Sequence, residues 1–65
     1  MKISYFVETD TLYIELKSTG VTDTRDLDEN TLLDLDGDGN LVSITMEHAS
    51  TRTDVQHIIL SGIAA

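Results

Sequence analysis

The chain has no cysteine, and this absence excludes several kinds of site and of stabilisation. Without a thiol there is no disulfide, no thiolate metal ligand and no cysteine nucleophile. A chain of 65 residues buries little apolar surface on folding, and such small domains commonly rely on disulfides, metal ions or self-association. Self-association is the device that remains here, so we expect a homodimer or a larger homo-oligomer.

Proline and long apolar runs are also missing. The apolar stretch Ile58-Ile59-Leu60 is far shorter than the roughly 20 residues of a membrane-spanning helix. Residues 1–8 contain no apolar core of the signal-peptide type. The chain shows no internal repeat, linker or low-complexity tract. We therefore expect a single domain over residues 1–65 and a cytoplasmic location.

Basic residues are scarce: 4 Lys and Arg stand against 12 Asp and Glu, a formal net charge of -8. A field of this sign repels phosphate backbones and anionic lipid, so we expect binding neither to nucleic acid nor to a membrane. It attracts a basic protein partner, although it also simply keeps a small sheet soluble. Much of the charge lies between residues 23 and 38, in Asp23, Asp26, Asp28, Glu29, Asp34, Asp36 and Asp38.

Five stretches have the alternation or the β-branched composition of strands, and short polar turns separate them. Parallel neighbours need crossovers of a dozen or more residues, so turns this short favour an antiparallel meander. The third stretch is polar, which is typical of a sheet edge. The stretches are residues 2–7, 11–17, 21–27, 31–35 and 41–46.

The end of the chain has helical signals after a connector at residues 47–52. Thr53 and Gln56 have the spacing of a capping box, and Asp54 suits the positive end of the helix dipole. A helix of about two turns does not persist alone, so its apolar stripe must pack on the sheet or on a partner subunit. The sequence thus predicts an α+β fold. The helical stripe consists of Val55, Ile58, Ile59 and Ile63, with Gly62 as the stop.

The turn at residues 34–40 has two interpretations. Asp34, Asp36 and Asp38 occupy positions 1, 3 and 5 of an EF-hand loop. Position 12, however, is Thr45, which cannot supply the two carboxylate oxygens of the usual glutamate. Asp-Gly and Gly-Asn between strand-like runs favour a tight hairpin instead. We predict the hairpin, and the three aspartates remain the candidate ligands of an alternative divalent-ion-binding module.

The residues with catalytic side chains form no recognisable active-site motif. His48 and His57 are nine residues apart, without the further ligand pair of a zinc site. Ser50 follows His48 at i+2, but no orienting acid is evident, and a role for Ser50 in capping or turning the chain is simpler. We predict no cofactor and no enzymatic activity. The alternative is a homo-oligomeric enzyme or small-ligand-binding protein with its site at the subunit interface, using His48, Ser50 and nearby carboxylates.

The chain has only three aromatic residues, Tyr5, Phe6 and Tyr13. Tyr5 falls on the apolar face of its strand, while Phe6 and Tyr13 fall on the opposite faces of theirs. If the two strands pair, Phe6 and Tyr13 form an apolar spot beside Ile44 or Leu32, of the kind that marks an interface. A small sheet also exposes some apolar surface without any function. We predict an interaction surface formed by Phe6, Tyr13 and Ile44.

Four motifs occur in a characteristic order: Met1-Lys2-Ile3-Ser4-Tyr5, Leu12-Tyr13-Ile14-Glu15-Leu16, Asp36-Gly37-Asp38-Gly39-Asn40-Leu41-Val42, and Ala49-Ser50. Together they resemble the short prokaryotic proteins grouped as domain-of-unknown-function family 2283. Gly37 and His48 depart from the family pattern, and the resemblance ends near residue 50. It implies a small antiparallel sheet with a helix, and it implies no activity.

These observations together predict a small acidic protein whose role is to bind another protein. One concrete version is an antitoxin-like protein that neutralises a small basic nuclease by charge complementarity. The expected partners are a second copy of the chain and a basic protein.

Overall fold

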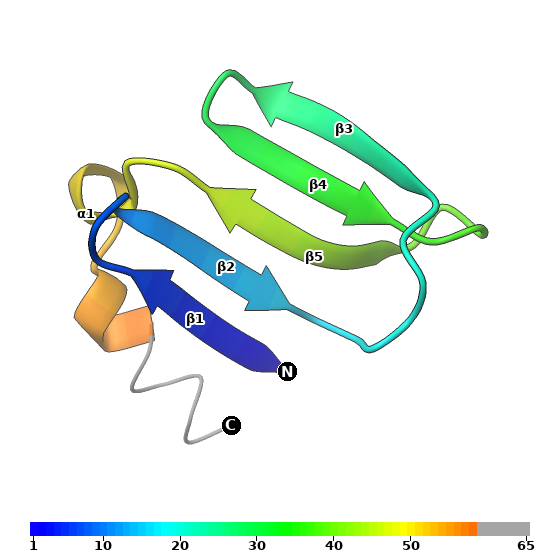
Figure 1. The fold of residues 1–65 in the computed structure, drawn as a ribbon, viewed down its shortest axis with the longest axis horizontal. Coiled ribbons are helices and arrows are strands. Elements are labelled where there is room, and N and C mark those ends of the chain that lie inside the picture. Colours follow the sequence, from blue (N-terminus) through cyan, green and yellow to red (C-terminus); the bar gives the residue numbers. More distant parts are fainter. Residues whose placement is uncertain (59–65) are drawn as a thin grey trace.

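The computed structural model describes residues 1–58 and confirms the α+β class, with five antiparallel strands and two short helical segments (Figure 1). The second helical segment covers residues 55–58. The other elements are β1 (Lys2–Phe6), β2 (Thr11–Glu15), β3 (Asp23–Asp28), β4 (Thr31–Leu35), β5 (Leu41–Met46) and α1 (Ala49–Arg52).

The strand order in the sheet is β1-β2-β5-β4-β3, and all neighbours are antiparallel. Consecutive strands therefore pair throughout, except that β2 pairs with β5 and not with β3. The chain between β2 and β3 crosses one end of the sheet, near the β4–β5 turn (Figure 1). An ion pair between Lys17 and Asp36 and a 2.8 Å hydrogen bond from Leu16 N to Val42 O hold this crossing in place.

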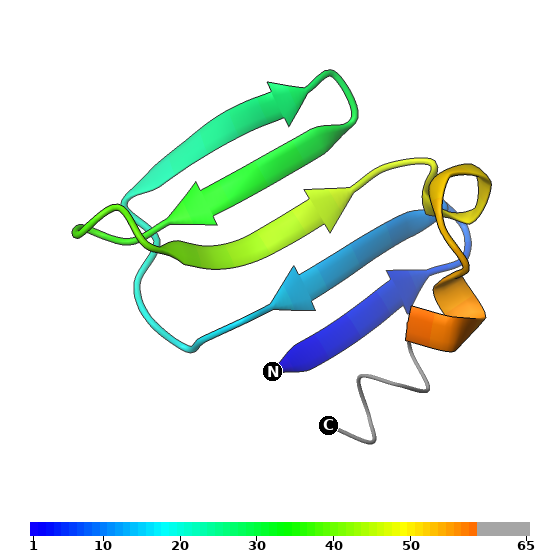
Figure 2. The same cartoon turned by 180° about the vertical axis from the view of Figure 1, so that it is seen from behind.

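The core lies on one face of the sheet, at the end where α1 follows β5. Residues that oppose each other in an antiparallel pair share a face. Leu12, Ala49 and Val55 are buried there, with relative exposures of 0%, 0% and 7%. Neither helical segment extends over β3 or β4 (Figures 1 and 2). The partly buried residues packed against this cluster are Ile3, Tyr5, Ile14, Met46 and Ile58.

The opposite face carries a row of polar side chains across all five strands. At its centre is the buried Ser43, whose Oγ donates a 2.7 Å hydrogen bond to Asp34 Oδ2. Thr24 Oγ1 donates to the other oxygen of Asp34 at 2.8 Å. These bonds satisfy polar groups that would otherwise destabilise a partly buried face. The row, in strand order, is Lys2, Glu15, Ser43, Asp34 and Thr24.

The hairpin predicted at residues 34–40 is confirmed, because β4 and β5 pair on either side of it. Asp36 Oδ1 accepts hydrogen bonds from Asp38 N at 2.9 Å and Asn40 N at 3.0 Å. Gly39 has a φ of 81°, a conformation that glycine adopts without a Cβ clash. The carboxylate of Asp36 therefore organises the turn.

The segment predicted as a connector, residues 47–52, contains α1. Thr53, which we expected to cap a helix, ends this one, since its N–H donates to Ala49 O at 3.0 Å. Asp54 caps the second segment instead: its Oδ1 accepts from His57 N at 3.3 Å. The expected residues Ile59, Gly62 and Ile63 lie outside the described residues. No helix within residues 1–58 is long and apolar enough to cross a membrane.

Candidate functional site

Asp10, in the β1–β2 turn, ties the start of α1 to the sheet. It has a φ of 53°, and its backbone oxygen accepts from Ala49 N at 2.9 Å. Its carboxylate accepts from Ser50 Oγ at 2.7 Å, from Ser50 N at 3.1 Å and from the Tyr5 hydroxyl. The carboxylate thus satisfies an N–H group that the first turn of a helix leaves without a partner.

The same hydrogen bonds shift two pKa values. The bond from Tyr5, followed by the bond from Ser50, lowers the pKa of Asp10 because both stabilise the ionised carboxylate. The pKa of Tyr5 is raised, chiefly because its hydroxyl proton is held by Asp10. Asp10 therefore stays ionised and holds α1 in place over a wide range of pH.

The geometry of Ser50 does not suit a nucleophile activated by His48. His48 is the N-cap residue of α1, with a φ of 56°, and its side chain is exposed. The proton of the Ser50 hydroxyl points at Asp10, a carboxylate whose lowered pKa makes it a poor base. Among residues 1–58, no hydrogen bond joins His48 to Ser50, so the two residues lie near each other without forming a nucleophile–base pair.

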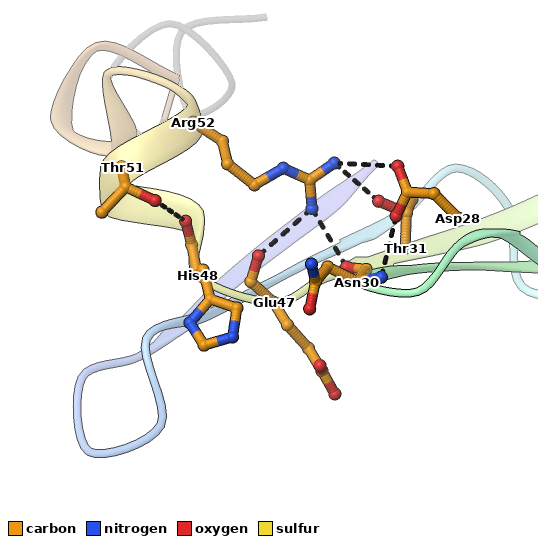
Figure 3. Close-up of polar contacts among 7 residues, drawn as sticks. All are labelled: Asp28, Asn30, Thr31, Glu47, His48, Thr51 and Arg52. Atoms are coloured by element: carbon orange, nitrogen blue, oxygen red, sulfur yellow. Dashed lines mark hydrogen bonds and ion pairs between the residues drawn. The ribbon is translucent and has the colours of Figure 1, made fainter.

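Arg52 fastens the other side of α1 to the β3–β4 turn (Figure 3). Its Nη1 donates to two backbone oxygens, Asn30 O at 3.0 Å and Glu47 O at 3.1 Å. Its Nη2 donates to Thr31 Oγ1 at 2.7 Å and lies 3.5 Å from Asp28 Oδ2. Together, Asp10 and Arg52 link α1 to the β1–β2 and β3–β4 hairpins.

The outer edge of the sheet at β3 is acidic and exposed. All six residues of β3 are exposed, and no strand within residues 1–58 pairs with its outer side. Asp23 pairs with Arg25 at 2.8 Å and Asp28 with Arg52 at 3.5 Å, whereas Asp26 forms no ion pair with any described residue. We call the four carboxylates Asp23, Asp26, Asp28 and Glu29 the acidic edge.

Asp28 and the β3–β4 turn are ordered locally. Asp28 Oδ1 accepts from Asn30 N at 2.8 Å, and this bond is the main reason why the pKa of Asp28 is lowered. Glu29, in the turn, is exposed and forms no ion pair within the described part of the chain. The carboxylates of the acidic edge are therefore only partly compensated by nearby cations.

The three candidate calcium ligands do not converge on one point. Asp34 lies on the polar row, bound to Thr24 and Ser43. The carboxylate of Asp36 is held by Lys17, and its pKa is lowered to about 2, first by that bond and then by the N–H of Asn40. Among residues 1–58, no three His, Asp or Glu side chains are placed to hold a metal ion, and these residues enclose no pocket.

The strand register corrects the composition of the predicted interaction surface. Phe6 opposes Thr11 and Tyr13 opposes Ser4, so Phe6 and Tyr13 are diagonal neighbours on one face. Thr45 links Tyr13 to Leu32 on that face. Phe6 is 55% exposed and Leu32 is 37% exposed. We call Phe6, Tyr13 and Leu32 the outer patch.

Ile44 does not belong to this surface, contrary to our expectation. It opposes Ile14 and Leu33, which lie on the face that carries the helical segments. The sequence shows which residues of a strand share a face but not how one strand is matched to another. The alternative neighbour, Leu32, is the residue that lies on the outer face.

The contacts that Asp10 and Arg52 make around α1 could not be recognised from sequence spacing alone. Asp10 and Ser50 are separated by 40 residues, and Arg52 is 22 residues from Asn30. The useful signal was the resemblance, because Tyr5 and Ala49-Ser50 belong to its motifs. The structure brings these three residues together around Asp10.

Comparisons with known proteins identify one family. A search of curated proteins and a search of solved structures each gave no match. The family described as "Protein of unknown function (DUF2283)" matches residues 2–50, which include all five strands and the first two residues of α1. Because this match covers most of the sequence and every strand, the chain belongs to the DUF2283 family.

Proposed function

We propose that this protein is a non-enzymatic protein-interaction module and that its acidic edge binds a basic protein. The observation that carries the proposal is that all six residues of the edge strand β3 are exposed, with Asp23, Asp26 and Asp28 among them. Carboxylates arranged along a free edge attract Lys and Arg side chains and accelerate encounter with a basic surface.

The charges of β3 also define how a partner binds. Charged side chains and the register shift between Asp26 and Asp28 disfavour the addition of a further strand to this edge. Recognition therefore operates through side chains rather than through backbone pairing. A small nuclease, whose own substrate-binding surface is basic, is one partner of this chemistry, and binding to it would be antitoxin-like.

The use of the polar side chains favours binding over catalysis. Ser50 and Asp10 hold α1, Arg52 holds the β3–β4 turn, and Asp36 holds the β4–β5 turn. The carboxylates of the acidic edge, by contrast, are exposed. The side chains that are accessible to another molecule are thus carboxylates, which suit electrostatic recognition.

The proposal is tested by capture of partners from lysate of the native host at moderate salt, with identification by mass spectrometry. We expect one small basic protein, bound less tightly as the salt concentration rises. The double variant Asp26→Asn/Glu29→Gln should weaken its binding severalfold. The control, Glu8→Gln/Glu47→Gln, removes the same charge from exposed glutamates outside the acidic edge and should bind as the wild type does.

Two outcomes would contradict the proposal. One is the capture of no basic protein from the host. The other is equal weakening by the two double variants, because overall charge rather than the acidic edge would then be responsible.

A further inference from the structure

The outer side of β1 is the second free edge of the sheet, and it lacks the features that protect β3. Within residues 1–58, no strand pairs with this side of β1. Lys2 is its only charged residue, and its pairing with β2 runs from Lys2 to Phe6 without a register shift. Edge strands that remain unpaired usually carry several charges, a bulge or a proline. By these criteria β1 is suited to pairing.

Exposed apolar side chains surround this unprotected edge. Met1 is 68% exposed, Phe6 is 55% exposed and Val7 is 77% exposed. These three residues lie within the first seven of the chain, in a protein with a formal net charge of -8. Exposed apolar groups concentrated at one edge of an otherwise charged molecule indicate an interface.

We propose that β1 pairs antiparallel with β1 of a second copy of the chain, about a two-fold axis that passes between the two Ser4 residues perpendicular to the sheets. The two sheets then join into one ten-stranded sheet. Ser4 opposes Ser4 of the partner subunit, and Lys2 opposes Phe6 of the partner subunit. Such an interface is isologous, because the same strand is used on both sides.

This register follows from the side chains of β1. An axis at Ser4 matches all five residues of the strand, whereas an axis at Ile3 or Tyr5 leaves one end of the strand unpaired. It places the ammonium group of Lys2 beside the ring of Phe6 of the partner subunit, a favourable cation–π arrangement. The register also continues beyond the strand, where Met1 opposes Val7 of the partner subunit and both exposed side chains gain an apolar neighbour.

Electrostatics favour a second copy at β1 and disfavour one at β3. Two acidic edges placed together would repel each other. In the proposed dimer, β3 of each copy lies at an outer end of the ten-stranded sheet. Nine strand spacings of about 4.8 Å separate the two edges by about 43 Å, several times the Debye length of about 8 Å at physiological ionic strength. Both acidic edges also remain free, so the dimer does not depend on the proposed basic partner.

The absence of cysteine allows a direct test of the axis. In the variant Ser4→Cys, the two introduced thiols face each other across the axis at a separation that a disulfide spans. We expect mild oxidation to convert this variant to a covalent dimer on a non-reducing gel. The control Ser18→Cys places the thiol at an exposed position of the β2–β3 connection and should remain mostly monomeric on the same gel.

Charge variants at the same position test the dimer in solution. Ser4→Lys and Ser4→Glu each place like charges across the axis, so the mass measured by light scattering should fall from that of a dimer to that of a monomer. An equimolar mixture of the two variants should regain the dimer mass, which an unfolded protein would not do. Ser18→Lys should remain a dimer, and circular dichroism checks that each variant is folded.

Three outcomes would overturn the proposal: a monomeric wild type, a dimer that survives both Ser4 charge variants, or equal cross-linking at positions 4 and 18. A dimer that survives would place the contact on another surface, such as the outer patch. None of these outcomes bears on whether the acidic edge binds a basic protein.

Discussion

Replacement of Arg52 by methionine should substantially destabilise the protein, because among residues 1–58 the Arg52 side chain joins α1 to the β3–β4 turn (Figure 3). Methionine keeps much of the aliphatic length and removes the guanidinium. The buried hydroxyl of Thr31, a residue only 3% exposed, then loses its 2.7 Å donor. Asn30 O keeps a second partner, since Glu47 N donates to it at 2.8 Å.

The expected loss of stability comes mainly from the hydrogen bond between Arg52 and Thr31. The loss of a hydrogen bond from a charged donor reduces stability by about 1.5–3 kcal/mol. We expect a loss of about 2 kcal/mol, because the Thr31 hydroxyl keeps its hydrogen bond with Asp28. A chain of this length has a total stability of only about 3–10 kcal/mol, at 0.05–0.15 kcal/mol per residue. At 4–8 °C per kcal/mol, the Tm should fall by about 8–16 °C. The ion pair with Asp28 contributes least, because the Asp28 side chain is 52% exposed.

Urea unfolding followed by circular dichroism measures this loss, and a double-mutant cycle assigns it. Thr31→Val removes the accepting hydroxyl at nearly constant volume, so the hydrogen bond between Arg52 and Thr31 is absent from each single variant and from the double variant. We expect Arg52→Met and Thr31→Val to be non-additive by about 1 kcal/mol. Strict additivity, or a loss below about 0.5 kcal/mol for Arg52→Met, would refute the reasoning, because surface substitutions without structural roles fall in that range.

Two further predictions concern the core and the β4–β5 turn. Leu12→Ala, at a residue with 0% exposure, should reduce the free energy of unfolding by about 3–4 kcal/mol in urea titrations, whereas Leu27→Ala, at 66% exposure, should change it by less than about 0.5 kcal/mol. The pKa of Asp36 is lowered from 3.8 to about 2, so the unfolded chain takes up this proton first as the pH falls. The stability that Asp36 provides is therefore complete above about pH 4 and is lost towards pH 2. The Tm of Asp36→Asn should fall less steeply than that of the wild type over this interval, and parallel curves would contradict the assignment.

The strands could be predicted from the sequence because alternation is a local property. In β2, the core residues Leu12 and Ile14 alternate with Tyr13 and Glu15, and the structure has the same two faces. The pairing of β2 with β5 could not be predicted in this way. Alternation fixes the faces of a strand, but it does not identify the neighbour or the register, and Ile44 was assigned to the wrong face for this reason.

The polar contacts around α1 could not be predicted from the sequence, for a different reason. A helical segment of four residues has too few internal hydrogen bonds to be recognised from propensity. Asp10 and Arg52 hold it through contacts with distant parts of the chain. Within the sequence, Asp10 was one acid in a polar turn and Arg52 the end of a connector. Their functions depend on the strand order, which only the structure provides.

The strand order also has a consequence for how the protein folds. The β1–β2 hairpin and the β3–β4–β5 unit each contain only contacts between adjacent segments, and such local contacts form early. Their junction, where Tyr13 meets Thr45, closes a loop of 32 residues and must wait for both halves. We therefore expect the pairing of β2 with β5 to be the slow step of folding. Amide protons along this strand pair report on global unfolding, whereas those of the free edges exchange through local opening.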